Sequence, residues 1–344
     1  MNAKLLVCAL FWPLAAMAQG FAGLGGSADE FDVPQPEYQF DFPADHGPHP
    51  SYRIEWWYLT ANLTGEDGRD YGIQWTLFRS ALKPFETAGW QSPQIWMGHA
   101  ALTTPERHFF AERLSRGGIG QAGVTAYPFE AWIDEWRMAG PTLQTLTLTA
   151  NGADFGYDLN LSASGPLVFH GENGFSVKSA DGQASYYYSQ PGYAVQGTLH
   201  LPDGDVAVTG NGWLDREWSS QPLAADQSGW DWFSLSFEDG DKLMAFRLRG
   251  GRGDYTSATW INPDGSSRSL SDGSVIFTPL ETSRVAERDV PTDWRVTIPG
   301  EDLDIRVQAQ NTQAWMGTGF QYWEGPVTVS GSHKGRGYLE MTGY

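Results

Sequence analysis

The sequence predicts an all-β protein built from two antiparallel β-barrels in tandem. Short runs rich in Val, Thr, Tyr, Trp and Phe fill most of the chain, and long helical periodicity is hard to find. The 41 Gly and 20 Pro residues are spread between these runs, which is typical of many short strands joined by tight turns. An internal repeat divides the 344 residues into two similar parts.

Turn signals that contain Asp-Gly separate many of the expected strands. They lie at residues 66–68, 202–204, 238–240 and 263–265. The strands with the clearest pattern are residues 73–78, 143–150, 157–162, 184–188, 206–209, 242–248, 294–298, 303–307 and 327–330. Residues 128–138 are an exception, because the spacing of their Trp and Ile residues suits a short helix or a packed loop.

The repeat has an opening and a closing motif. Residues 56–79 and 230–248 both read as a Trp-rich strand, a tight turn and an apolar strand that ends near an arginine. The string Gly-x-Gly-aromatic-Leu-acid occurs at 210–215 and again at 335–340. A barrel closes when its last strand pairs with its first, so recurring opening and closing motifs predict two copies of one domain. Chance similarity between Trp-rich and Gly-rich β-sequences is the alternative.

The first residues have the features of a secretory signal peptide. Lys4 is followed by an apolar run, and Ala16-Met17-Ala18 forms a cleavage site. The run is shorter than the roughly 18 apolar residues of a transmembrane helix. We therefore expect cleavage after Ala18, a periplasmic or secreted location, and a protein that is not integral to the membrane. The only cysteine, Cys8, would leave with the peptide, so the mature protein would have no disulfide.

These observations give a predicted organisation. It consists of a signal peptide at 1–18, a flexible leader at 19–37, an N-terminal domain at 38–222 and a C-terminal domain at 229–344. The linker candidate is 219–229. The net charge of −19 argues against nucleic acid or an anionic membrane surface as a partner, because the protein would repel phosphates.

Strand alternation places tryptophans and charged residues on the same faces. In the strand at 53–58, Glu55 and Trp57 lie on one face and Trp56 and Tyr58 on the other. In the strand at 213–218, Asp215 and Glu217 lie opposite Arg216 and Trp218. In the strand at 230–237, Trp230 and Trp232 lie opposite Asp231. A barrel interior that holds a ligand would explain such mixed faces, since binding sites are mostly apolar with a few polar groups. A buried network, in which Glu55 or Asp215 pairs with Arg216, explains them equally well.

The candidate site residues follow from these faces. The candidate catalytic residues are Glu55, Asp215, Glu217 and Asp231, because a carboxylic acid with a pKa raised by burial can donate a proton. The candidate ligand-binding residues are His49, Trp56, Trp57, Tyr58, Arg216, Trp218, Trp230 and Trp232. No metal or cofactor is expected: His46 and His49 lack a third ligand at metal spacing, and the glycine string at 118–123 lacks the context of a dinucleotide site.

Three strings resemble a known family. They are His46-Gly47-Pro48-His49-Pro50 followed by Glu55-Trp56-Trp57-Tyr58, then Trp213-Leu214-Asp215-Arg216-Glu217-Trp218, then Gly229-Trp230-Asp231-Trp232-Phe233. In combination they resemble the AttH-like, carotenoid 1,2-hydratase-related (CrtC) family of secreted proteins, over residues 38–344. The resemblance implies two lipocalin-like barrels in tandem. For the hydratase branch it implies addition of water to the terminal double bond of an acyclic carotenoid.

The hydratase residues are only partly present. The string at 215–218 is similar to Asp-His-Asn-Trp of the hydratases, in which the His and the Trp are implicated in catalysis. Trp218 keeps the Trp, but Arg216 stands in place of the His. A further Tyr and Asp correspond roughly to Phe246 and Leu248, which cannot transfer a proton. An acid would have to come from Glu55, Asp215, Glu217 or Asp231.

Three functions remain open. The first is a lipocalin-like protein that binds an apolar or amphipathic molecule, such as a lipid or isoprenoid. The AttH-like resemblance implies that such a protein serves an envelope ABC-transporter system. The second is a cofactor-independent hydratase, isomerase or cyclase that acts on a terpenoid alkene. The third is a structural or interaction module without a ligand. A cavity beside the tryptophans would separate the first two from the third.

Overall fold

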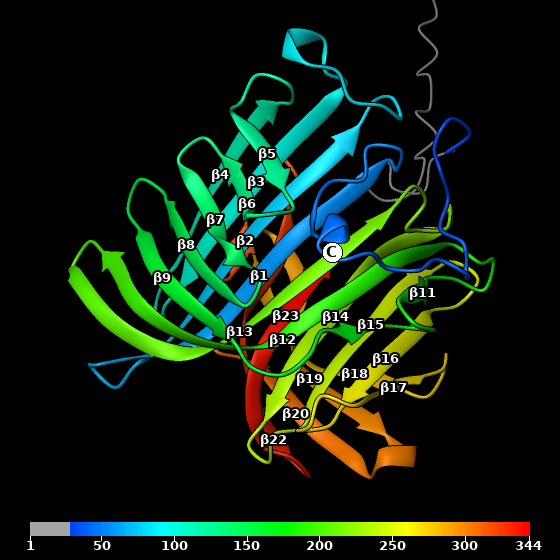
Figure 1. Ribbon diagram of the computed structural model, residues 1–344. Helices are drawn as coiled ribbons and strands as arrows, with labels where there is room; N and C mark the ends of the chain where they lie inside the picture. The colour runs from blue at the N-terminus through cyan, green and yellow to red at the C-terminus, as the bar shows by residue number, and fades with distance from the viewer. Residues whose placement is uncertain (1–27) are drawn as a thin grey trace, which may run out of the picture.

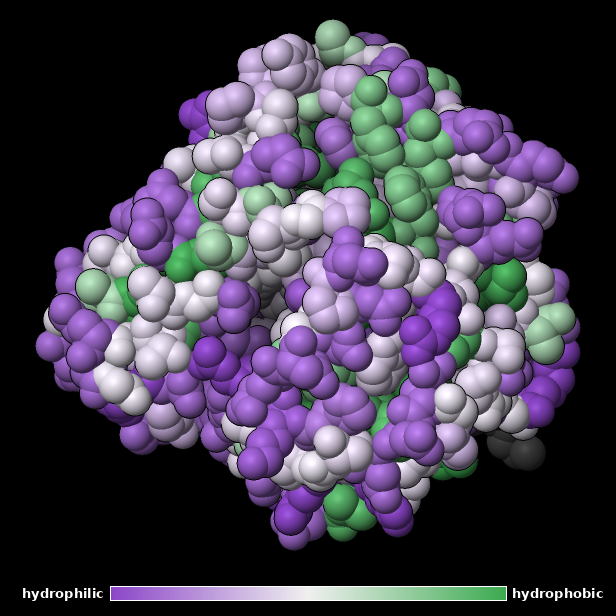
Figure 2. All heavy atoms as spheres, turned by 60° about the horizontal axis from the view of Figure 1, so that its bottom comes forward, coloured by the Kyte–Doolittle hydropathy of each residue, from purple (hydrophilic) through white to green (hydrophobic). Residues whose placement is uncertain are grey.

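The computed structural model describes residues 28–344, so the predicted signal peptide lies outside the described residues. The chain forms two antiparallel sheets that lie against each other (Figure 1). The described helical turns are Ala44–His46, Gly89–Gln91 and Pro299–Glu301. Within residues 28–344, no helix has the length and apolar character needed to cross a membrane. Figure 2 shows a face with mostly hydrophilic side chains that is hollowed between two lobes.

The first sheet has 13 strands. Its order is β4-β3-β2-β1-β13-β12-β9-β8-β7-β6-β5, with β10 and β11 also paired to β12. The strands are β1 (Ile54–Gly65), β2 (Asp70–Ala81), β3 (Gln94–Thr103), β4 (His108–Arg116), β5 (Ala122–Thr125), β6 (Phe129–Ile133), β7 (Trp136–Thr142), β8 (Thr145–Asn151), β9 (Gly156–Ala163), β10 (Val168–Phe169), β11 (Phe175–Val177), β12 (Ala184–Leu201) and β13 (Gly204–Ser219).

The second sheet has 10 strands. Its order is β17-β16-β15-β14-β23-β22-β20-β19-β18, with β21 also paired to β22. The strands are β14 (Gln227–Phe237), β15 (Lys242–Gly250), β16 (Tyr255–Ile261), β17 (Ser267–Leu270), β18 (Ile276–Val285), β19 (Arg288–Ile298), β20 (Leu303–Ala309), β21 (Trp315–Met316), β22 (Tyr322–Gly331) and β23 (Gly335–Thr342).

The all-β prediction is confirmed, and the repeat is visible in the strand pairing. The opening strand of each sheet pairs with its closing strand, β1 with β13 and β14 with β23. Each opening hairpin also places an acid opposite an arginine: Glu55 faces Arg79, and Asp231 faces Arg247. The first sheet curls into a nearly closed barrel and the second into a half-barrel (Figure 1).

Each barrel has its own packed core. Trp57, Trp75 and Trp136 lie in the first core, and Trp294 and Trp323 lie in the second; none is more than 1 % exposed. These rings and many aliphatic side chains occupy the barrel interiors. A third cluster, which includes tryptophans of β13 and β14, lies between the sheets. The aromatic excess therefore serves two cores and one interface.

Residues 128–138 are not a helix or a loop, so that expectation is wrong. They form most of the hairpin of β6 and β7, with a turn at Asp134, which has a φ of 51°. Trp136 is fully buried and its Nε1 donates to the carbonyl of Asn151 at 2.9 Å. The apparent helical spacing arose because two strands of alternating pattern meet across a two-residue turn.

Residues before β1 cover one end of the first barrel. The N–H of Gln35 donates to Tyr186 Oη at 2.7 Å, and Tyr38 stacks on the Tyr186 ring with centroids 4.2 Å apart. Phe40 and Phe42 pack into the same aromatic cluster, which also contains the buried Trp218. This part of the chain closes the barrel end beneath which the Glu55 carboxylate lies.

Gly72 of β2 packs against Pro326 and Tyr338 of the second sheet, and we predict that Gly72→Ala destabilises the fold. A Cβ there would come within 2.6 Å of Pro326 Cγ and of Tyr338 Oη, both on the second sheet. We expect the free energy of unfolding, measured by urea denaturation, to fall by about 1–3 kcal/mol. Gly300→Ala is the control, because nothing lies within 4 Å of its Cβ position. Equal stability of the two variants would contradict a tight contact between the sheets.

Candidate functional site

A cavity of ≈ 260 Å³ lies between the two sheets. Aromatic side chains from both sheets form most of its wall: Trp56 and Tyr58 of β1, Tyr187 of β12, Trp230 and Trp232 of β14, and Phe246 of β15. Each strand contributes residues two apart, as alternation requires. The predicted residues Trp56, Tyr58, Trp230 and Trp232 therefore meet at one place, on the faces where the sequence put them.

Three carboxyl groups also line this cavity. Asp215 and Glu217 come from β13, and Glu340 comes from β23. Lys178 is the cation of the lining, and its Nζ lies 2.9 Å from Glu217 Oε1 with both side chains 7 % exposed. The cavity thus combines aromatic walls with more acids than bases.

Asp215 is the most unusual of these acids. Burial raises its pKa from 3.8 to about 7, although hydrogen bonds from Ser189 and Trp213 oppose the shift. The Trp213 Nε1–H donates to Oδ1 at 2.9 Å, and the Ser189 hydroxyl donates to the same oxygen. Oδ2 is buried and makes no hydrogen bond of standard geometry within residues 28–344, although the Tyr187 hydroxyl lies close enough to the carboxyl group to lower its pKa. One side of the carboxyl group is therefore fixed, and the other is free to meet a ligand.

A hydrogen-bonded chain runs from Asp215 into the protein. Ser189 Oγ lies 2.6 Å from His170 Nε2, and His170 Nδ1 lies 2.9 Å from Thr259 Oγ1 on the second sheet. Burial, together with the nearby Lys178, lowers the pKa of His170 well below its usual range, so the imidazole is neutral. This chain holds Ser189, and through it Asp215, in one orientation.

Glu340 is the counterpart of Asp215 on the second sheet. It occupies the acid position of the repeated closing string, and burial raises its pKa to about 7. The Trp230 Nε1–H donates to its Oε1 at 2.5 Å. Each barrel thus supplies one acid from its closing strand, and each acid accepts a hydrogen bond from an indole.

A second path leads from the cavity to the surface. Tyr322, which lines the cavity, has its Oη 2.9 Å from His99 Nδ1. His99 Nε2 lies 3.2 Å from Glu112 Oε1, and the Glu112 side chain is 24 % exposed. Burial lowers the pKa of His99, while Glu112 opposes that shift. The hydroxyl of Tyr322 in the cavity, the buried imidazole of His99 and the carboxylate of Glu112 near the surface therefore form one hydrogen-bonded chain.

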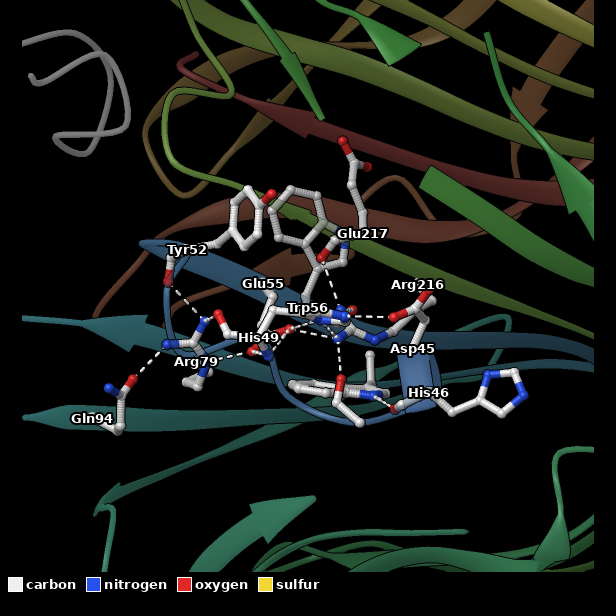
Figure 3. A network of polar contacts seen from close by, with 12 residues as sticks. Asp45, His46, His49, Tyr52, Glu55, Trp56, Arg79, Gln94, Arg216 and Glu217 are labelled. Atoms are coloured by element: carbon white, nitrogen blue, oxygen red, sulfur yellow. Dashed lines mark hydrogen bonds and ion pairs between the residues drawn. The ribbon is translucent and has the colours of Figure 1, made fainter. Parts of the chain in front are cut away.

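Glu55 belongs to a different structure, a closed ionic network inside the first barrel (Figure 3). Its carboxylate lies between the guanidinium groups of Arg79 and Arg216 and accepts a hydrogen bond from the N–H of His49. Burial alone would raise its pKa, but the two arginines hold the pKa well below the usual range. Glu55 is thus an ionised structural residue and does not offer a proton.

Arg216 makes several further contacts in this network, although its Nε and the Trp218 Nε1 have no hydrogen-bond partner within residues 28–344. Arg216 also donates to the carbonyls of Gly47 and Glu217, and its guanidinium lies 3.9 Å from the centroid of the Trp57 ring. His49 stacks on Trp218 at 4.0 Å. The candidate ligand-binding residues His49, Trp57, Arg216 and Trp218 therefore lie in the network and not in the cavity wall. Trp57, Arg216 and Trp218 occupy the inward faces of their strands, and His49 belongs to the segment before β1.

Asp231, the last candidate acid, lies inside the second barrel. Arg247 Nη2 is 2.7 Å from its Oδ2, and the Tyr344 hydroxyl donates to its Oδ1 at 2.7 Å. Burial raises the pKa of Asp231 against the opposing effect of Arg247 and Arg249. Asp231 is the counterpart of Glu55 in the second barrel, because the pair of Asp231 with Arg247 repeats the pair of Glu55 with Arg79.

Sequence reasoning missed several residues of the cavity. Lys178, Tyr187 and Tyr322 lie outside the repeated motifs, so no pattern singled them out. Glu340 could have been found, because the closing string aligns it with Asp215. No group of three or more His, Cys, Asp or Glu side chains that could hold a metal ion occurs in the described part of the chain.

Comparisons with known proteins agree with this architecture. A crystal structure of a putative AttH from Nitrosomonas europaea is 34 % identical, with a TM-score of 0.82 over 91 % of this chain and 99 % of that one. Kievitone hydratase from Nectria haematococca shares the fold: it is 16 % identical, with a TM-score of 0.68 over 91 % of this chain and 96 % of that one. CghA also shares the fold, at 14 % identity and a TM-score of 0.57 over 92 % of this chain and 97 % of that one. A search of the curated proteins gave no match. The AttH-like family matches residues 33–344, and the chain belongs to that family.

Proposed function

We propose that this protein binds an apolar or amphipathic small molecule between its two sheets and transfers a proton to it without a cofactor. The reaction class is that of a hydratase, isomerase or cyclase acting on an alkene. The observation that supports it is the position of Asp215 and Glu340 in one aromatic cavity, each hydrogen-bonded to an indole. Lipid and isoprenoid chains fit such a wall, since apolar area dominates it.

Asp215 is the proton donor in this proposal. Its neutral form carries the proton toward the cavity on Oδ2, the oxygen that makes no hydrogen bond of standard geometry. When the proton moves to an alkene carbon, the carboxylate that forms keeps its hydrogen bonds from Ser189 and Trp213. A donor with a pKa near the working pH is the most effective general acid.

The cation that forms lies against aromatic rings. Trp56, Trp230 and Trp232 border the cavity, and the face of an indole stabilises a positive charge by roughly 0.5–2 kcal/mol. Glu340 or Glu217 then activates water in a hydratase or removes a proton in an isomerase or cyclase. Tyr322, His99 and Glu112 return protons between the cavity and the surface.

The solved relatives support the reaction class only by analogy. Kievitone hydratase and CghA have the same fold, although the identity of the hydratase to this chain is only 16 %. A periplasmic or secreted protein would meet lipids of the cell envelope, and an envelope ABC transporter would deliver or remove the ligand. Storage or transport of the ligand without reaction is the outcome to separate from catalysis.

An isotope experiment tests the proposal without a known substrate. The protein is first examined by native mass spectrometry for a molecule that co-purifies with it. That molecule, or a lipid extract of the producing cells, is then incubated with the protein in D2O or in water labelled with 18O. We expect deuterium in a product carbon–hydrogen bond, accompanied by 18O for a hydratase. Asp215→Asn is expected to slow incorporation by about 10²–10⁴-fold.

Asp205→Asn is the matched control for this experiment. Asp205 lies on the same strand, ten residues earlier and so about 30 Å away, with an exposed side chain. It should incorporate deuterium at the wild-type rate. A retained ligand with no isotope incorporation would leave a binding protein and overturn the catalytic part of the proposal.

A further inference from the structure

A second cavity of ≈ 490 Å³ lies between the sheets, toward the far ends of the same strands. It is lined by residues that continue the strand faces of the aromatic cavity. On β1, Thr60 and Asn62 follow Tyr58, and on β14, Ser234 and Ser236 follow Trp232, in steps of two. Along the interface between the sheets, the lining therefore changes from aromatic and acidic side chains in the first cavity to hydroxyl and amide side chains in the second.

An aromatic partition separates the two cavities. Tyr58, Trp213, Trp232 and Tyr338 belong to one buried cluster, and none of them is more than 9 % exposed. Trp213 connects the two sides, because its ring lines the polar cavity while its Nε1 donates to Asp215 of the aromatic one. The polar cavity is therefore a compartment of its own.

Two buried hydroxyls point to a ligand. Thr60 and Ser234 line this cavity, and their side chains are only 2 % and 3 % exposed. Buried polar groups are nearly always paired with protein or with ordered water. The two hydroxyls border the cavity, where the hydroxyl groups of a ligand are suitable partners for them in place of water.

The charges of the lining favour a neutral ligand. Arg336 is already used: its Nη1 lies 3.0 Å from Thr64 Oγ1 and 3.1 Å from Asp70 Oδ1. Glu238 adds a further negative charge to the lining. Asp70 and Glu238 together outweigh Arg336 in the lining, so a phosphate or carboxylate would meet a net negative charge there. Asn62 donates to the carbonyl of Gly337 at 2.9 Å and keeps its amide oxygen as an acceptor.

We propose that this polar cavity binds a neutral saccharide of one or two rings. Thr60, Ser234 and Asn62 supply donors and acceptors for its hydroxyls, and the Trp213 ring supplies an apolar wall for its carbon–hydrogen face. Binding there would be sensed by Asp215 through Trp213 Nε1. The polar cavity can hold such a ligand whether or not the aromatic cavity is catalytic.

Saturation-transfer NMR with methyl α-D-glucopyranoside, maltose and trehalose tests the site on the full chain. We expect at least one of these saccharides to bind at millimolar concentration and to shift the indole N–H signal of Trp213 in protein labelled at tryptophan. The double variant Thr60→Val/Ser234→Ala keeps the shape of the lining and removes its hydroxyls. It should weaken binding about tenfold or more.

Ser80→Ala is the matched control, because Ser80 lines the aromatic cavity instead. It should bind the saccharide like the wild type. Circular dichroism establishes that each variant is folded before it is titrated. Absence of binding by all three saccharides, wild-type affinity in the double variant, or tighter binding of inorganic phosphate would each overturn the proposal and leave a cavity filled by water.

Discussion

Replacement of Arg216 by methionine is expected to lower the free energy of unfolding by about 3–5 kcal/mol, because it breaks a buried ion pair on one side only. Glu55, which has no exposed surface, would keep a single arginine partner. The carbonyls of Gly47 and Glu217 would lose their donor, and Trp57 would lose the guanidinium that covers its ring. Urea denaturation followed by circular dichroism measures the change.

Arg295→Met is the matched control for this effect. Arg295 pairs with Asp304 at 2.6 Å, but both side chains are more than half exposed. Solvent screens such a pair, so its loss should cost no more than about 1 kcal/mol. The double variant Arg216→Met/Glu55→Gln should be no more stable than Arg216→Met, since it leaves the buried Arg79 without its carboxylate partner. A loss below 1 kcal/mol in Arg216→Met would mean that water reaches Glu55.

The sequence predicted the fold through its repeat and its alternation. The paired opening and closing motifs correspond to β1 with β13 and β14 with β23, because strand pairing is what those motifs encode. Alternation also sorted Trp56 from Trp57 and Asp215 from Arg216. The buried network explains the inward face, where Glu55 pairs with Arg216, whereas the aromatic cavity lies on the outward face and not in a barrel interior.

The position of the cavity could not be predicted in the same way. The sequence suggested a barrel interior, since a single strand does not show what covers its outward face. In the structure that face is covered by the other sheet, so the cavity depends on how two barrels pack. Lys178 and Tyr322 line the cavity from segments outside the repeated motifs, so no local sequence pattern predicted their role.

Asp215 and Glu340 are expected to make the protein less stable as the pH rises from about 4 to about 7. Each pKa is raised by burial to about 7 in the folded state, against 3.8 and 4.5 as usual values. In this window the folded state holds protons that the unfolded state has released, so the free energy of unfolding falls with pH. For Asp215 the loss is about 4 kcal/mol over some three pH units.

Asp215→Asn should remove the Asp215 contribution to this pH dependence of stability, because an amide does not titrate. The slope of the unfolding free energy between pH 4 and pH 7, measured by urea denaturation, should become less negative by about 1.4 kcal/mol per pH unit. Glu340→Gln should act in the same direction, while Asp205→Asn, at an exposed position on β13, should leave the slope unchanged. A wild-type slope that the Asp215 variant does not alter would mean that Asp215 is ionised in the folded protein. The cavity would then lack its proton donor, and only the binding function would stand.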